Sequence, residues 1–184
     1  MTTRIWTTRL DSNTAAFKSA FGNLSEAQLN WKPDPQTWSI AQNIDHLIVI
    51  NKTYYPVIQS VREGTYTLPL IGKFGFMVRF MSKVLLNAVQ PDRRKKMKTF
   101  PVWEPSSSTI AGDILERFGD HQEDLKHLII NSQDLLEKGT LISSPANRNI
   151  VYKLETAFEI IVIHEQRHFA QAREVLEKLN TASL

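Results

Sequence analysis

Residues 151–179, with the sequence VYKLETAFEIIVIHEQRHFAQAREVLEKL, determine how the rest of the chain is interpreted. Read as a helix, this stretch has one apolar face, on which residues recur every three or four positions. Side chains four residues apart lie one above the other on a helix, so two imidazoles on this face are expected to stack and to point into the core. The residues on the face are Leu154, Phe158, Ile161, His164, His168, Gln171 and Val175.

A pair of histidines on an apolar helix face needs partners. Each imidazole nitrogen that leaves water must be hydrogen-bonded or must bind a metal ion, because a buried polar group without a partner is costly. For His164 and His168 we therefore favour metal binding over two separately hydrogen-bonded core histidines. The functional interpretation of the chain depends on this pair.

Three further helices are predicted from apolar residues at helical spacing. The first runs from Ile5 to Phe21 and ends at Gly22, and a capping box at Ser25 then opens a short turn. A second capping box, Ser39 with Gln42, opens the next long helix. The apolar positions of that helix are Ile40, Ile44, Leu47, Tyr54, Ile58 and Val61, and it ends at Glu63-Gly64.

Proline and serine positions set the remaining boundaries. Pro56 is expected to kink the second helix or to end it early, since proline cannot donate a backbone hydrogen bond. Ser106–Ser108 are expected to cap the third helix, and Gly139–Asn149 to form a polar loop before the fourth. No alternating strand pattern of useful length is visible. The apolar stripe of the third helix is Ile110, Ile114, Phe118, Leu125 and Ile129.

The predicted architecture is an all-α four-helix bundle in a single domain, residues 1–184, with a long crossover between helices two and three. The crossover, residues 64–105, is rich in glycine, proline and aromatic residues, and Phe74–Val89 within it is expected to be helical. A connection of this length usually crosses over a fold or covers a site. We therefore consider a role as a lid over the site.

Composition limits the chemistry. The 184 residues contain no cysteine, which excludes disulfides and thiolate metal ligands and fits a reducing cytoplasm. A net charge of +3 does not indicate nucleic acid as a partner, and the apolar runs are too short to span a membrane. The basic run Arg93–Lys98 is interpreted as a solvated loop, with anion binding as the alternative.

The string HEQRH matches H-E-x-x-H, in which two helical histidines hold zinc and the glutamate acts as general base. A zinc protease of this kind needs a third ligand downstream and strands to bind a peptide, and neither is visible here. The third ligand must therefore come from upstream, and His46 is the best candidate because it lies beside the apolar seam of the second helix. His121 is a weaker fourth candidate, and His127 is expected at the surface.

Three polar residues are candidates for supporting roles. Glu165 points about 100° away from His164 around the helix, so an edge or second-shell position is favoured over catalysis. Gln171 either orients a ligand or packs at the edge of the bundle, and Asn43 is a candidate to hydrogen-bond a substrate. The alternative for His46 is an ordinary hydrogen-bonded histidine at the boundary of the core.

Three stretches resemble the DinB superfamily, which includes the YfiT-like metal-dependent hydrolases. They are LSEAQLNWKPDPQTWSI (24–40), WSIAQNIDHLIVINKTYY (38–55) and HEQRHFAQA (164–172). The resemblance implies a four-helix bundle, frequently a homodimer, with a divalent metal, zinc, nickel or iron, held by His46, His164 and His168. Related proteins include thiol-dependent transferases and isomerases that use bacillithiol or mycothiol.

Two classes of function follow. In the first, the chain is an enzyme in which the metal activates water or a low-molecular-weight thiol for hydrolysis of a small molecule or for S-transfer to it. In the second, the metal only staples the helices of a non-catalytic binding or stress-response module. The first predicts an open coordination position and turnover that a chelator abolishes, whereas the second predicts loss of stability alone when the metal is removed.

Overall fold

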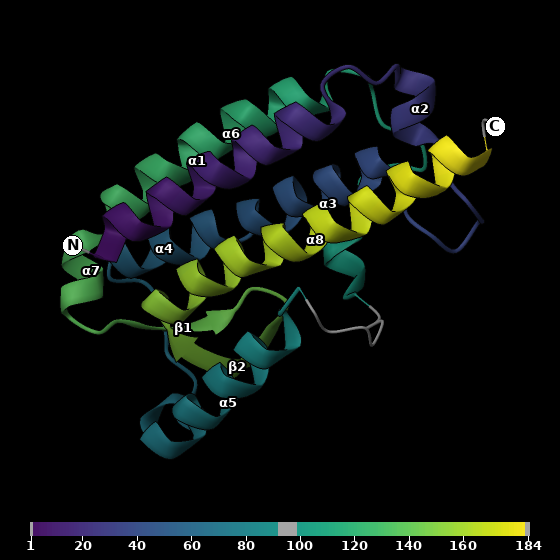
Figure 1. Cartoon of the computed structure of the whole chain (residues 1–184). Helices are drawn as coiled ribbons and strands as arrows, with labels where there is room; N and C mark the ends of the chain where they lie inside the picture. The colour runs from purple at the N-terminus through teal and green to yellow at the C-terminus, as the bar shows by residue number, and fades with distance from the viewer. Residues whose placement is uncertain (1, 92–98, 183–184) are drawn as a thin grey trace.

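The computed structural model describes residues 2–91 and 99–182, so the basic run Arg93–Lys98 lies outside the described residues. Four long helices form the bundle (Figure 1), and α1 and α3 each pack against both α6 and α8. The predicted all-α bundle is confirmed. None of the described helices combines the length and the apolar character needed to cross a membrane. The bundle helices are α1 (Thr2–Phe21), α3 (Ile40–Lys52), α6 (Ile114–Ile130) and α8 (Leu154–Ala182).

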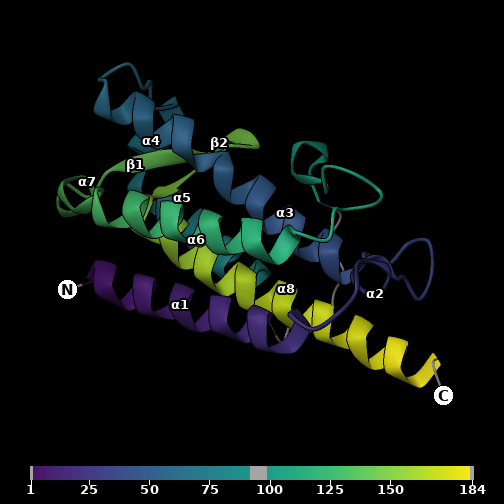
Figure 2. The same ribbon diagram turned by 90° about the horizontal axis from the view of Figure 1, so that it is seen from above.

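The order of the helices explains the long crossover. In Figures 1 and 2, α3 and α6 both run from the end of the bundle near α2 (Glu26–Asn30) toward the end near the N-terminus. After α3 the chain must therefore return along the bundle before α6 can begin, as expected for this topology. The return contains η1 (Leu70–Lys73), α5 (Gly75–Ala88) and η2 (Pro101–Trp103). The helix expected at 74–89 is thus confirmed, and α5 packs on the β-hairpin and α8.

Both predicted capping boxes are present, at Ser25 and Ser39. The second predicted helix is divided at Thr53 into α3 and α4 (Tyr54–Arg62). Pro56 explains the division, because its nitrogen cannot donate to a carbonyl one turn earlier. At the third position of α4, where the first backbone N–H groups have no partner within the helix, the proline costs little.

The predicted cap of the third helix at Ser106–Ser108 is wrong, because α6 begins at Ile114 with Asp113 as its N-cap. Tertiary hydrogen bonds hold the preceding backbone in an irregular path instead. Ile110 N donates to Asn30 Oδ1 at 2.8 Å, and the Asn30 amide donates to Ile110 O at 2.7 Å. The backbone of Ile110 is therefore bonded to a distant side chain and not within a helix.

The polar loop predicted at 139–149 is largely a β-hairpin, which the sequence reading missed. The strands β1 (Leu141–Ser144) and β2 (Asn147–Lys153) pair antiparallel, with Ile142 opposite Tyr152. The hairpin also moves the start of the last helix, which begins at Leu154 rather than near Val151. The hairpin packs on α5 and lies beside the start of α8 (Figure 1).

The core has two apolar halves separated by a polar layer. One half lies toward the hairpin and contains Leu10, Leu125 and Phe158, whereas the other contains Phe17, Phe118 and Val175. Between them each bundle helix contributes buried polar side chains. These are Asn13 on α1, His46 and Asn51 on α3, His121 and Gln122 on α6, and Glu165 and His168 on α8.

Candidate metal centre

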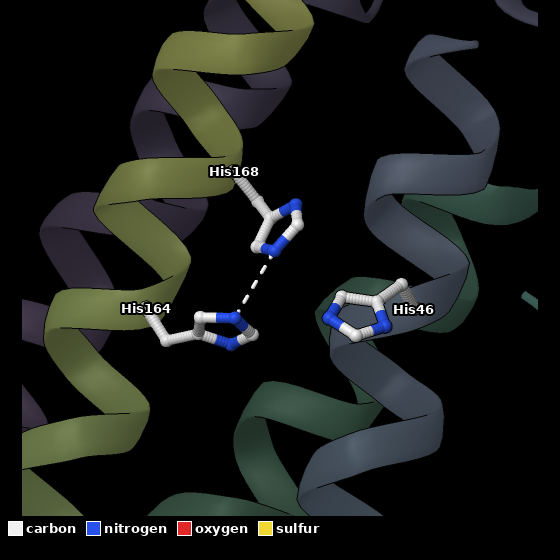
Figure 3. A group of neighbouring side chains, drawn as sticks. All are labelled: His46, His164 and His168. Carbon is white, nitrogen blue, oxygen red and sulfur yellow. Dashed lines mark hydrogen bonds between the residues drawn. The ribbon is translucent and has the colours of Figure 1, made fainter. Parts of the chain in front are cut away.

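Three imidazoles meet where α3 and α8 face each other across the polar layer. One ring nitrogen from each of His46, His164 and His168 lies within 4.8 Å of the other two. The ring centroids are 4.6 Å apart for His46 and His168, 5.2 Å for His46 and His164, and 4.5 Å for the pair on α8. Figure 3 shows the three rings pointing into the space between the two helices.

The local sequence accounts for this placement. His164 and His168 are one helical turn apart, so they project from the same face of α8. On α3, the capping box of Ser39 fixes the start of the helix, and His46 follows about two turns later. Trp38 precedes the cap, and its ring lies 4.9 Å from that of His46 and 5.9 Å from that of His168. The Trp38 ring thus flanks two of the three imidazoles.

Asn43 sets the proton position on His168. The Asn43 Nδ2 group donates to Ser39 O at 2.9 Å, which leaves Oδ1 as the acceptor that faces the histidine. His168 Nδ1 lies 2.8 Å from this oxygen and must donate to it. The neutral ring therefore has its lone pair on Nε2, the nitrogen directed at His164.

A backbone carbonyl fixes His46 in the same way. His46 Nδ1 lies 2.5 Å from Trp103 O and donates to it, because a carbonyl oxygen can only accept. The lone pair of the neutral ring is then on Nε2. Hydrogen bonds that hold the outer nitrogen of a histidine and leave the inner one free are typical of metal ligands.

The spacing of the nitrogens suits a divalent ion. His164 Nε2 and His168 Nε2 are 3.1 Å apart (Figure 3). Two imidazole nitrogens bound to one tetrahedral zinc ion at about 2.0–2.1 Å would be roughly 3.3 Å apart. Three neutral imidazoles are also a donor set that zinc, nickel and iron accept. The residues present therefore fit a metal ion.

The surroundings keep the three histidines neutral. Burial lowers the pKa of His46 to about 4, against the smaller opposing effects of the Trp103 carbonyl and Asp45. Burial also holds the pKa values of His164 and His168 well below 6.5, and the neighbouring imidazoles and Arg167 lower them further. A neutral imidazole is the form that binds metal, so this environment favours binding at neutral pH.

Glu165 of the HEQRH string does not face the three rings. The expectation for Glu165 was an edge or second-shell position, and the full burial of its side chain excludes the edge. Its carboxylate accepts hydrogen bonds from the side-chain amides of Asn13 at 3.0 Å, Asn51 at 3.1 Å and Gln122 at 2.8 Å. It therefore joins all four bundle helices through one buried group. Gln171, one turn beyond His168, is half-buried.

The other two candidate histidines lie apart from the centre. His121 is buried on α6 as expected, but within the described part of the chain the converging ligand atoms belong only to His46, His164 and His168. His121 lies instead beside Tyr55, with ring centroids 6.3 Å apart. His127 is exposed, as predicted.

Sequence reasoning missed two groups at the centre and assigned a third differently. Trp38 was noted only as part of a family motif, and nothing in the sequence linked the carbonyl of Trp103 to a histidine 57 positions away. Asn43 was proposed to hydrogen-bond a substrate, whereas both ends of its amide are already used inside the protein. For Asn43 we now propose a positioning role toward His168.

The Asn43→Ala variant is expected to bind zinc about 10- to 100-fold more weakly, because loss of the partner leaves the His168 ring free to rotate and change tautomer. Asn43→Asp should stay within a few-fold of the wild type, since a carboxylate still accepts from Nδ1. Asn180→Ala, at an exposed site on α8, is the control. Competition with a chromophoric chelator gives the affinities. Equal affinity of the Asn43→Ala variant and the wild type would contradict this role.

Most of the chain is similar to known proteins. A model of the DinB superfamily matches residues 9–172, a range that includes all three histidines. A curated relative is an uncharacterized protein of Bacillus subtilis (strain 168), YuaE, which is 26% identical over 159 residues, spanning 86% of this chain and 90% of YuaE. No solved structure matches the chain significantly.

Proposed function

Because the chain belongs to the DinB superfamily, we propose that it is a metal-dependent enzyme whose divalent ion is held by His46, His164 and His168. We propose that this ion activates a low-molecular-weight thiol, or water, for S-transfer to a small electrophile or for its hydrolysis. The observation that carries the proposal is the convergence of three neutral imidazoles, two of which, His46 and His168, have their outer nitrogen hydrogen-bonded elsewhere.

The roles of the residues follow from this geometry. The three imidazoles would hold the ion, while Asn43 and the Trp103 carbonyl would keep His168 and His46 in the binding tautomer. Three protein ligands leave at least one coordination position free, as in catalytic rather than structural zinc sites. An ion so bound lowers the pKa of a thiol or of water and thereby supplies a nucleophile near neutral pH.

The ionisation of the two possible nucleophiles favours the thiol. In the described part of the chain, the converging donor atoms come from histidines alone, with no carboxylate among them. Glu165 is occupied by three amides, and its pKa is raised to about 7 by burial. Zinc-bound water ionises near pH 7 and is therefore only partly deprotonated at neutral pH, whereas a free thiol ionises near pH 8.5 and is fully deprotonated on binding a metal. We therefore place S-transfer ahead of hydrolysis.

The test is a chelator-sensitive reaction. Protein loaded with zinc, nickel or iron is incubated with bacillithiol, mycothiol or a simpler thiol and a panel of small electrophiles, and loss of free thiol is followed. We expect metal-dependent acceleration that a chelator abolishes and His164→Gln removes, with His127→Ala as an active control.

The alternative is a metal-stapled module without turnover. It is favoured by one observation, that the ligands come from two helices, α3 and α8, and are largely buried. A metal there would stabilise the bundle whether or not it reacts. Metal binding that raises the melting temperature, together with no chelator-sensitive thiol loss across the panel, would support this alternative over the enzyme.

A further inference from the structure

Residues 103–108, here called the strap, lie along α3 and are held by three side chains on one helix face. Residues 42, 45 and 46 share this face because they are three and four positions apart. Each makes a hydrogen bond with the strap backbone. The bonds are Gln42 Nε2 to Ser107 O (3.2 Å), Ser106 N to Asp45 Oδ2 (2.7 Å) and His46 Nδ1 to Trp103 O (2.5 Å).

A side chain anchors the same strap at its first residue. Trp103 Nε1 donates to Thr53 Oγ1 at 3.2 Å, one residue beyond the end of α3. The Trp103 ring also meets the ring of Phe100 edge to face, with centroids 5.4 Å apart. Asp45, which holds the middle of the strap, is only 1% exposed. The strap is therefore fixed at several points by groups that do not touch the metal centre.

We propose that the strap is a positioning element for the metal centre, so that metal binding at His46 and docking of the strap on α3 strengthen each other. This inference rests on the proposed metal site. It assigns to the final part of the crossover a function that a simple connection would not have: the strap sets the tautomer and orientation of one ligand.

The physical reason is that the His46 imidazole would bind the metal through Nε2 and binds the strap through Nδ1. A metal at His46 Nε2 requires the proton on Nδ1, and the proton on Nδ1 is what Trp103 O binds. Without metal, the His46 ring can exchange tautomers and lose this bond. With metal, Nδ1 is an obligate donor. By linkage, whatever factor the docked strap adds to metal affinity, the metal adds to docking of the strap. Outer partners of metal-bound histidines typically contribute 10- to 100-fold in affinity.

The strap can be loosened without touching the metal centre. Gln42→Glu keeps the capping box, because a carboxylate still accepts from Ser39 N, but it can no longer donate to Ser107 O. Thr53→Val removes the acceptor of Trp103 Nε1 at almost constant volume. The double variant should therefore weaken docking while leaving all three ligands in place.

The same two substitutions at exposed positions of the chain serve as controls. Gln28 occupies the same capping-box position at the start of α2, and Gln28→Glu repeats the first substitution away from the strap. Thr181 bonds to the carbonyl three residues earlier, as Thr53 does, so Thr181→Val repeats the second. The control double variant carries both.

The experiment measures zinc affinity by chelator competition, and amide hydrogen exchange of the 103–108 peptide with and without zinc. We expect the Gln42→Glu/Thr53→Val variant to bind zinc about 10-fold more weakly, while the control variant equals the wild type. Zinc should slow exchange in the wild-type strap and slow it less in the strap variant.

Each outcome has a distinct meaning. Wild-type affinity in the strap variant, or strap exchange that zinc leaves unchanged, would overturn the coupling while leaving the metal site intact. A wild type that binds no zinc would overturn the proposed metal site itself. The two failures are thus distinguished by the first measurement on the unmodified protein.

Discussion

Replacing His168 by glutamine or alanine is expected to lower zinc affinity by at least about 100-fold, with equal effects at His46 and His164. Apparent zinc-binding free energies of about 10–16 kcal/mol, divided among four ligands, give roughly 2.5–4 kcal/mol for each, which corresponds to about two to three orders of magnitude. Chelator competition with purified protein that has no histidine tag gives the affinities. Glutamine keeps much of the side-chain volume, so it separates loss of a ligand from loss of packing.

Two histidines outside the centre provide matched controls. His127 is exposed, and His127→Ala should change neither zinc affinity nor stability. His121 is buried but distant from the converging ligands, so His121→Ala should change stability and leave zinc affinity unaltered. If any one of the three proposed ligands could be replaced with full retention of affinity, the assignment of that ligand would be wrong.

Glu165→Ala is expected to lower the free energy of unfolding by about 3–5 kcal/mol. The carboxylate is the shared acceptor for the amides of Asn13, Asn51 and Gln122. Its removal leaves a cavity and takes this acceptor from all three amides, although Asn13 Nδ2 still donates to Val162 O. Urea unfolding with a chelator present measures the change. A loss under about 1 kcal/mol would mean that the polar layer does not depend on this group.

The Glu165→Gln variant tests the same group through pH. The folded pKa of Glu165 is raised to about 7 from an ordinary 4.5, chiefly by burial. Such a group stabilises the folded state fully below pH 4.5, and this contribution is lost as pH rises through 7. The free energy of unfolding of Glu165→Gln, relative to that of the wild type, should therefore rise by roughly 2–3 kcal/mol between pH 5 and pH 8. If the difference in unfolding free energy between the variant and the wild type did not change with pH, the raised pKa of Glu165 would be contradicted.

The bundle and the three histidines were predictable because both depend on local spacing. Apolar positions every three or four residues gave the long helices, and His164 and His168 four positions apart must share a face of α8. The choice of His46 needed a further step, a position beside the apolar seam of α3. The structure brings all three together as the sequence reading expected.

The parts that were missed depend on contacts between distant residues. The hairpin strand β2 has Val151 and Tyr152 buried in succession, so the alternation that marks a strand is absent, and its turn contains Pro145-Ala146 rather than a glycine. The start of α6 was misplaced because Ser106 binds Asp45 instead of capping a helix. Hydrogen-bond partners of this kind cannot be read from spacing.

The polar layer links the fold to the proposed chemistry. It interrupts the apolar core at the level of the three imidazoles, and Glu165 ties the same level of α8 to the other three bundle helices. Buried polar groups cost free energy unless each is satisfied, so a layer of this kind is expected to be kept for function or for specificity of packing. The glutamate of HEQRH thus has a structural role in this chain, and the two histidines are the proposed metal ligands.

The most direct test of the metal centre is anomalous diffraction at the zinc edge from crystals of the zinc-loaded protein. The account predicts one strong peak between α3 and α8, bonded to His46 Nε2, His164 and His168 at about 2.0–2.1 Å, with at least one further position free of protein atoms. Zinc peaks only elsewhere on the protein, or a peak at this place that one of the three rings does not reach, would contradict it.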